Sequence, residues 1–289
     1  MILMSDKLMG IVACGIGGSY YVLVDGEQYV CNARGIFRKR EIEPLAGDFV
    51  ELTNVDEGKK TALIHQILPR KNSLARPKAA NIDLVIITAA AVPKPNPALL
   101  DALLITCEAR EMDAMLCFNK ADLDTDELNE LARGYEMAGY LVLMVSAKTG
   151  QGMDKLWEAM DGKTCIFAGS SGVGKSSLIN AICPDQQMET GELSRRIDRG
   201  KHTTRQTRLI PVKSAFIIDS PGFSTLNVDG IPKEELQNHY PEFDEYKKSC
   251  YYLDCLHVSE HDCAVKEQVG ATIDYGRYER YVRYVTKQE

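Results

Sequence analysis

Residues 169–176 have the clearest chemical meaning in this sequence, because they fit the pattern G-x-x-x-x-G-K-[ST]. The apolar run 164–168 before them predicts a buried strand, and the run 177–182 after them predicts the first turns of a helix. In that setting the backbone N–H groups of the loop point at phosphate oxygens, and the helix N-terminus adds a partial positive charge. The pattern therefore predicts a site for nucleotide phosphates. An ordinary glycine-rich turn explains it poorly, because both flanks agree with the pattern.

The side chains of this loop have distinct expected roles. Lys175 would reach the β- and γ-phosphates, and the Ser176 hydroxyl would hold Mg²⁺. The residues that we expect around the phosphates are Ala168, Gly169, Ser170, Ser171, Gly172, Val173, Gly174, Lys175 and Ser176.

A second phosphate-binding element follows the strand predicted at 215–218, which runs into the D-x-x-G sequence 219–222. Asp219 is expected to bind Mg²⁺ through water, and the Gly222 N–H is expected to contact the γ-phosphate. The segment 189–208 before that strand is rich in Arg, Gly and Thr. A mobile threonine there can complete the Mg²⁺ shell when the triphosphate is bound, and we favour Thr204 over Thr203. A polar loop without a ligand is the alternative.

A base-binding motif ends the strand predicted at 114–118. In Asn119-Lys120-Ala121-Asp122, the carboxylate of Asp122 can accept hydrogen bonds from guanine N1–H and the exocyclic amine. Adenine lacks both donors there, so an unpaired carboxylate would reject it. Asn119 would tie this loop to the phosphate loop, and the Lys120 stem would cover the base.

The sequence Ser146-Ala147-Lys148 ends the next predicted strand, 141–145. The Ala147 N–H would donate a hydrogen bond to the guanine O6. Four-residue matches are common by chance, but the combination with the phosphate loop predicts a guanine nucleotide, GTP or GDP. An ATP-dependent kinase or ATPase that uses the same phosphate loop is disfavoured by Asp122.

The order of the elements predicts how these loops meet. Predicted strands at 82–88, 114–118 and 141–145 alternate with helical segments at 99–110, 126–138 and 152–161. This alternation predicts a mainly parallel sheet covered on both faces. Ligands bind beyond the carboxyl ends of such strands, which is where the motifs fall.

The first 70 residues have a different pattern. Short β-rich runs with glycine-containing turns predict a small all-β barrel, for which an OB-fold is one option; the runs are 9–14, 20–24, 28–31, 49–52 and 61–64. The tract 34–40 carries Arg34, Arg38, Lys39 and Arg40, and such a loop either follows a phosphate backbone or is simply solvated. The proline-bracketed basic segment 69–77 predicts a domain boundary.

The composition sets broad limits on the function. The chain has 289 residues, which suggests two or three domains, and its 26% charged and 45% apolar residues are those of a globular protein. No apolar stretch approaches the length of a membrane span and no signal peptide is evident, so we expect a cytoplasmic protein without membrane contact. The net charge of −7 means that any binding of nucleic acid needs local basic patches.

Three of the nine cysteines lie close together near the C-terminus. Cys250, Cys255 and Cys263 with His257 supply three thiolates and an imidazole, the closed ligand set of one structural zinc ion. His261 is a competing ligand, and a disulfide with one free cysteine is the alternative that a reducing compartment disfavours. Because the segment is short and polar, metal binding would contribute much of its folding energy.

The order of the motifs resembles the RsgA (YjeQ/YloQ) family of circularly permuted GTPases. The base motifs precede the phosphate loop here, whereas in Ras-like GTPases they follow it. The resemblance rests also on Arg70-Lys71-Asn72, Arg76-Pro77, 200–204, 219–223 and the cysteine cluster, and it covers nearly the whole chain. At Arg205 this chain departs from the family, which often has a third threonine there; this bears on the choice between Thr203 and Thr204.

The resemblance implies three domains: an OB-fold barrel at 1–70 that binds RNA, a permuted α/β P-loop GTPase domain at 71–229, and a mostly α-helical zinc-binding domain at 230–289. It implies magnesium with GTP, one structural zinc with His257 as the ligand, and GTP hydrolysis stimulated by the small ribosomal subunit. The chain would bind that subunit through its rRNA as a monomer and assist its late maturation. Nucleotide state would control docking and release. A nucleotide-gated RNA-binding module with negligible turnover is the alternative.

Two assignments stay open at this level. Phe223 stands where a Ras-like enzyme carries the glutamine that orients water, so slow intrinsic hydrolysis is expected. His202 is the candidate catalytic residue, with RNA contact or packing as rivals. The arginines and tyrosines of the helix predicted at 277–284 would either contact RNA, which the resemblance favours, or pack on the zinc domain, which their composition favours.

Overall fold

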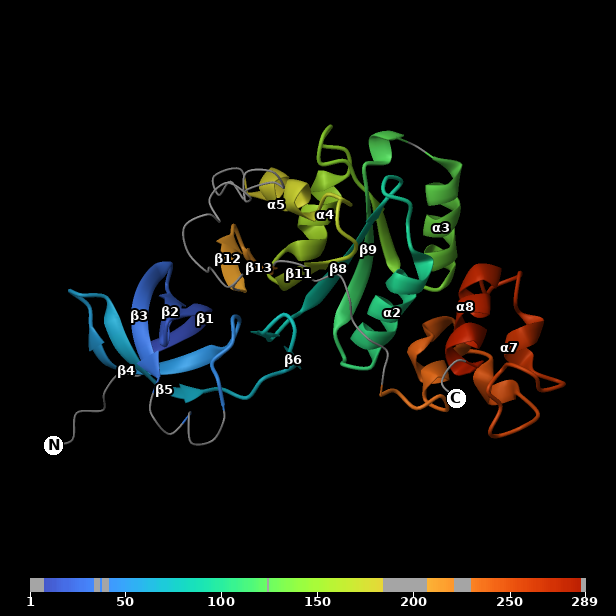
Figure 1. Ribbon diagram of the computed structural model, residues 1–289, viewed down its shortest axis with the longest axis horizontal. Coiled ribbons are helices and arrows are strands. Elements are labelled where there is room, and N and C mark those ends of the chain that lie inside the picture. The colour runs from blue at the N-terminus through green and yellow to red at the C-terminus, as the bar shows by residue number, and fades with distance from the viewer. Residues whose placement is uncertain are drawn as a thin grey trace. The chain divides into compact units, whose positions relative to one another are not determined.

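The computed structural model of the protein describes residues 8–33, 37, 42–123, 125–183, 207–220 and 230–286 (Figure 1). Contacts within the chain divide it into two units. The first comprises 1–84, 160–166 and 191–223, and the second comprises 85–159, 167–190 and 224–289.

The first unit begins with a closed barrel of five strands, drawn in blue in Figure 1. The strands follow the order β1-β2-β3-β5-β4, with β3 and β5 parallel and β1 closing on β4. Their bounds are β1 Leu8–Ile16, β2 Ser19–Val24, β3 Glu27–Ala33, β4 Phe49–Asp56 and β5 Thr61–Ile67. This five-stranded closure matches the predicted OB-like barrel and confirms the all-β prediction for this part of the chain.

Alternating side chains of these strands fill the barrel. Val12, Val22, Val50 and Ile64 are fully buried in its core. Phe37 also belongs to this core, so its ring is not free to stack on a nucleobase. The basic side chains that flank it in the sequence lie outside the described residues.

The segment predicted as a domain boundary is held by side chains of the first unit. The buried carboxylate of Asp48 accepts two hydrogen bonds from the Arg70 guanidinium, at 2.7 and 2.8 Å. Asn72 both donates to and accepts from the backbone of Ile82, as a strand neighbour would. The short strands β6 Ser73–Leu74 and β7 Ala79–Ala80 pair between these contacts. At least one basic residue of this segment therefore has a structural role, because Arg70 neutralises the buried Asp48 carboxylate.

The central sheet has six strands in the order β10-β9-β8-β11-β13-β12. The β9–β10 and β11–β13 pairs are parallel, and β12 pairs antiparallel with β13 at one edge. The strands are β8 Leu84–Ala90, β9 Asp113–Asn119, β10 Leu141–Met144, β11 Thr164–Ala168, β12 Arg208–Val212 and β13 Ala215–Asp219. β8 and β11 are buried along their whole length, which is why they read as continuous apolar runs in the sequence.

Helices connect these strands as the periodicity predicted. They are α2 Pro97–Glu108, α3 Asp126–Met137, α4 Met153–Met160 and α5 Lys175–Ile182, with the short 3₁₀ turn η1 Ala121–Leu123 after β9. α2 begins with Pro97 at its first turn, and the Asn96 side chain accepts a hydrogen bond from the Leu99 N–H. Among the described residues, every helix is too short or too polar to cross a membrane.

The C-terminal part of the second unit is mostly helical and irregular. It consists of η2 Leu236–His239, η3 Pro241–Phe243, η4 Lys247–Ser249, α7 Ala264–Glu267 and α8 Tyr275–Thr286. Its core is aromatic: Tyr240, Phe243 and Tyr281 contact one another with ring centroids 4.9–5.2 Å apart. Ala102 and Ile105 of α2 belong to the same core. This part therefore has more core of its own than the polar sequence suggested, and α2 completes it.

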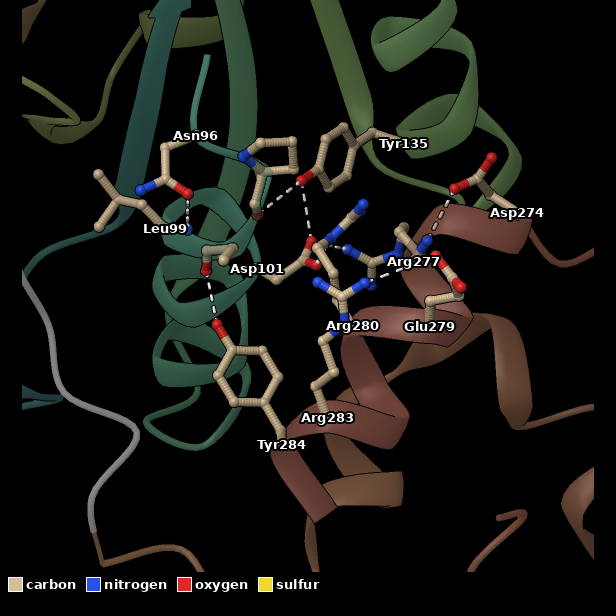
Figure 2. A network of polar contacts seen from close by, with 12 residues as sticks. Asn96, Leu99, Asp101, Tyr135, Asp274, Arg277, Glu279, Arg280, Arg283 and Tyr284 are labelled. Atoms are coloured by element: carbon tan, nitrogen blue, oxygen red, sulfur yellow. Dashed lines mark hydrogen bonds and ion pairs between the residues drawn. The ribbon is translucent and has the colours of Figure 1, made fainter. Parts of the chain in front are cut away.

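α8 is fixed to α2 by buried charges (Figure 2). The Arg277 side chain, 1% exposed, donates to Asp101 at 2.9 Å and contacts Glu242 at 2.5 Å. Arg280 also pairs with Asp101, which accepts a further hydrogen bond from the Tyr135 hydroxyl at 2.8 Å. The two arginines thus satisfy two buried carboxylates.

This arrangement decides between the two interpretations of the helix. Arg277 and Tyr281 are buried, Arg280 is engaged with Asp101, and the Tyr284 hydroxyl donates to the Ala98 carbonyl. The interpretation of Arg277, Arg280 and Tyr281 as RNA contacts is therefore wrong, because the two charges are paired with buried acids and the Tyr281 ring is buried. The helical period that suggested a recognition surface reflects packing on α2.

Replacing Arg277 by methionine is expected to lower the free energy of unfolding by about 3–5 kcal/mol. The substitution keeps much of the side-chain volume but leaves the buried Glu242 carboxylate without its partner. The midpoint of urea denaturation measures the effect. Arg283→Met on the exposed side of the same helix is the control, with an expected change within about 0.5 kcal/mol. Equal losses in both variants would contradict this account of the network.

Candidate nucleotide and metal sites

The phosphate loop connects β11 to α5, in the strand–loop–helix setting that the pattern requires. Gly169 has φ +130°, and a Cβ there would lie 2.1 Å from the Thr88 carbonyl oxygen. Gly174 has φ +96°, and a Cβ would lie 2.3 Å from the Asn119 Nδ2. Both positions therefore require glycine. Gly169 lies against the backbone of β8, and Gly174 lies against the Asn119 side chain of the base motif.

Lys175 lies over the loop that precedes it. Its ammonium donates to the carbonyls of Gly169 and Ser170, at 2.6 and 2.7 Å. Burial lowers the pKa of Lys175, because the charged form loses hydration there. An ammonium that is held by neutral carbonyls in a partly buried loop gains from an anionic ligand, and phosphate oxygens are such a ligand. Ser176 follows in the first turn of α5.

Asn119 joins the phosphate loop to the base motifs. The side chain is buried; its Nδ2 donates to the Val173 carbonyl at 2.9 Å, and its Oδ1 accepts from the Ala147 N–H at 3.2 Å. Lys120, with φ +61°, donates to the Gly172 carbonyl at 2.9 Å. Three motifs that are separated in the chain thus converge at the carboxyl ends of β9, β10 and β11, as the order of the predicted strands suggested.

Asp122 is oriented by Ser146. The Ser146 hydroxyl donates to the Asp122 Oδ1 at 2.7 Å and accepts from the Thr149 N–H at 3.2 Å. The hydrogen bond from Ser146 lowers the pKa of Asp122, with smaller contributions from Lys148 and Lys120. The carboxylate is therefore ionised at neutral pH and accepts hydrogen bonds, as recognition of two guanine donors requires.

Asp219 ends β13, the strand that pairs with β11. Burial raises the pKa of Asp219, and Arg208 on β12 partly opposes this effect. A desolvated carboxylate of this kind binds a cation favourably, since the cation restores the stabilisation that water supplied. The predictions for Gly222, His202, Thr203 and Thr204 fall outside the described residues.

Asp219→Asn is expected to stabilise the protein at pH 7 in the absence of nucleotide and Mg²⁺. Because the folded-state pKa lies above the unfolded value, the ionised carboxylate opposes folding at neutral pH and the protonated form does not. The gain, under about 1 kcal/mol, should shrink as the pH falls through the raised folded-state pKa towards about 4, because the folded protein then carries the neutral acid. Urea midpoints at several pH values measure it, and a loss of stability at pH 7 would contradict the prediction.

The metal-ligating cluster is assembled as the spacing predicted. Its four ligand atoms, from Cys250, Cys255, His257 and Cys263, lie within 4.8 Å of one another. The His257 Nδ1 is 3.3 Å from the sulfurs of Cys255 and Cys263 and 3.5 Å from that of Cys250. Ligands about 2.0–2.3 Å from a tetrahedral zinc ion have such separations. The cluster fits one zinc ion, whereas His261 is exposed and lies outside it.

The second ring nitrogen of His257 is also engaged. Its Nε2 lies 2.8 Å from the Gln237 Oε1, so Nε2 carries the proton and Nδ1 is free to bind metal. Burial lowers the pKa of His257, which favours the neutral ligand form. From α8, the hydroxyls of Tyr278 and Tyr281 donate to the carbonyls of His257 and Leu256.

Gln237→Met is expected to reduce zinc affinity about 10- to 100-fold while leaving the fold intact, because the imidazole loses the group that fixes its tautomer. Competition with a chromophoric zinc chelator measures the change. Gln268→Met, at an amide that is not part of the ligand cluster, is the control. Equal zinc affinity in the Gln237 and Gln268 variants would mean that Gln237 does not orient the ligand.

Sequence reasoning missed several residues of these sites and of the charge network between α2 and α8. Gln237 lies in a short 3₁₀ turn far from the cysteines in the chain, and Asp101 lies within an apolar helix. Thr149 contacts Ser146 through its backbone, which no side-chain pattern reveals. The acid at Asp101 was the one available signal, since an aspartate among leucines requires a buried partner.

Comparison with known proteins identifies the chain's relatives. The family model described as RsgA GTPase matches residues 67–229, and the model described as RsgA N-terminal domain matches residues 9–64. A protein of Agathobacter rectalis named small ribosomal subunit biogenesis GTPase RsgA is 45% identical, covering 95% of this chain and 96% of its own.

Two solved structures have the same fold. YjeQ from Thermotoga maritima is 33% identical with a TM-score of 0.83, covering 97% of this chain and 98% of its own. YloQ, described as a circularly permuted GTPase, is 33% identical with a TM-score of 0.80, covering 99% of this chain and 96% of its own. The fold of those two chains is thus shared along nearly their full length.

Proposed function

The chain belongs to the RsgA family of GTPases, and from that premise we propose that it hydrolyses GTP in order to act on the small ribosomal subunit. The relatives' names indicate a GTPase of small-subunit biogenesis. In our proposal the chain docks on the subunit through its rRNA, assists late maturation and is released according to nucleotide state. In the same proposal the chain acts in the cytoplasm and as a monomer.

The observation that carries the proposal is the double hydrogen bond of Asn119. One side chain contacts the phosphate loop at Val173 and the second base motif at Ala147. A nucleotide that spans these loops would have its phosphates near Lys175 and its base near Asp122. These two hydrogen bonds fix the base loop relative to the phosphate loop, and a site that is specific for GTP requires such a fixed arrangement.

The roles proposed for individual residues follow from their contacts. Lys175 would exchange the loop carbonyls for the β- and γ-phosphates, and the backbone N–H groups of 169–176 would cradle them. Asp122 would accept from the guanine, and Lys120 would cover the ring. The other proposed nucleotide contacts, which include Ala168, Lys148 and Gly222, rest on the family pattern.

Two ions complete the proposed assembly. Magnesium, held by Ser176, Thr204 and Asp219, would neutralise charge on the β- and γ-phosphates. Zinc, held by the four ligands of the C-terminal cluster, would be structural, because protein atoms fill its tetrahedral shell. His202 remains the proposed catalytic group.

We further propose three modules, at 1–70, 71–229 and 230–289. The matches to the two family models at 9–64 and 67–229 support boundaries near these positions. Since Arg277 and Arg280 of α8 are paired with buried carboxylates, we assign the rRNA contact to the barrel, and the basic tract at 34–40 is the candidate segment.

The test is single-turnover GTP hydrolysis with and without purified small ribosomal subunits, together with co-sedimentation in GDP and in a non-hydrolysable GTP analogue. Stimulation by the subunits and nucleotide-dependent binding are the expected results. Lys175→Ala should abolish the activity, whereas Lys155→Ala, an exposed lysine on α4, should not change it. Nucleotide-dependent binding without stimulated hydrolysis would favour the alternative of a nucleotide-gated module.

A further inference from the structure

Three consecutive apolar side chains of the metal-binding segment project into solvent. Tyr251, Tyr252 and Leu253 are 75%, 46% and 107% exposed, and they form the loop between the ligands Cys250 and Cys255. Single exposed apolar residues are common, but three in succession at the tip of one loop are not explained by packing.

The loop is held at both ends. Cys250 and Cys255 anchor it to the metal cluster, and the Tyr251 N–H donates to the Asp262 carbonyl at 3.3 Å. The rings of Tyr251 and Tyr252 meet edge to face, with centroids 5.0 Å apart. A short loop that is fixed in this way loses little conformational entropy on binding, so its apolar tip is suited to fill a pocket on a partner.

The charge around the loop selects the kind of partner. Residues 230–289 contain twelve Asp and Glu against eight Lys and Arg, and Asp244, Glu245, Asp254 and Asp262 are exposed near the loop in sequence. Lys247 is paired with Asp244 at 2.6 Å, which leaves Glu245, Asp254 and Asp262 against the exposed Lys248. Acidic surroundings repel a phosphate backbone, whose binding requires lysine and arginine. They also disfavour a second copy of this chain, which carries a net charge of −7.

We propose that the loop 251–253 docks into an apolar pocket on a basic protein of the small ribosomal subunit, with the surrounding carboxylates facing its lysines and arginines. This inference rests on the proposed function and adds to it a protein contact beside the rRNA contact. The aromatic and aliphatic tip supplies the anchor, and the acidic rim supplies orientation.

The first test removes the tip. Tyr251→Ser with Leu253→Ser is expected to weaken co-sedimentation with small subunits about thirtyfold in the GTP analogue, as loss of an interface anchor does. Intrinsic hydrolysis and zinc content should not change, because both side chains are exposed. Leu141→Ser, which removes an exposed leucine from β10, is the matched control. Equal binding of the double variant and the wild type would overturn this inference alone. Absence of wild-type binding would overturn the proposed function as well.

The second test distinguishes a basic protein from rRNA. Asp254→Lys reverses an exposed charge beside the tip, so it should weaken binding to a basic protein and strengthen binding to RNA. A photo-crosslinker, p-benzoylphenylalanine in place of Leu253, should give a product with the subunit that resists ribonuclease and is degraded by protease. A crosslink to rRNA, or tighter binding of the Asp254 variant, would overturn the proposal.

Discussion

Asp122→Asn is expected to lower the affinity for GTP about a thousandfold and to create affinity for xanthosine triphosphate. Guanine presents two donors, N1–H and the exocyclic amine, to the ionised carboxylate that Ser146 orients. An asparagine amide accepts one of these hydrogen bonds but opposes the second with its own NH₂ donors. Xanthine has a carbonyl in place of the amine, so the amide fits it.

Equilibrium binding of fluorescent GDP, GTP and XTP analogues measures this exchange. Asp126→Asn, at the exposed start of α3, is the control and should bind GTP as the wild type does. A uniform loss of affinity for all three nucleotides would mean that Asp122 supports the fold of the loop rather than reading the base. Unchanged GTP affinity would remove Asp122 from the site.

Cys263→Ser is expected to release the metal and to unfold the C-terminal part of the second unit. Structural zinc contributes about 10–16 kcal/mol of apparent binding free energy in small domains, and here the aromatic core and α2 offset part of the loss. Metal analysis, the near-ultraviolet circular dichroism of the tyrosines and limited proteolysis of 236–286 measure the effect. The nucleotide affinity should fall less, since Asn119 and the phosphate loop belong to a separate set of contacts.

His261→Ala provides the matched control, because it removes an imidazole that lies two residues from Cys263 and outside the cluster. This variant should retain one zinc per chain and wild-type stability. Loss of zinc from the His261 variant would mean that His261, rather than His257, completes the ligand set. A fully folded Cys263 variant without metal would show that the core alone suffices.

The nucleotide site was more predictable than the surfaces around it. Backbone geometry requires the glycines with positive φ, and ligand chemistry requires the Asn119 amide and the spacing of the cysteines. Each requirement fixes a residue type at a given position, so it can be recognised in the sequence. The use of Arg277 and Arg280 was not predictable in this way. The sequence around an arginine in a polar helix is the same whether the side chain contacts RNA or a buried carboxylate. Here that carboxylate belongs to Asp101, more than 170 residues away.

The sequence by itself determined which chemistry this chain can perform and the order of its parts, because motifs for phosphate, guanine and metal are local and each residue type has few substitutes. Only the tertiary structure decided which charges are used inside the protein and which remain for partners. Burial depends on contacts between distant segments, such as those of α2 with α8 or of Arg70 with Asp48. Such contacts cannot be predicted from a local sequence pattern. For the same reason the exposed tip 251–253 became visible only once the rest of its segment was seen to be packed.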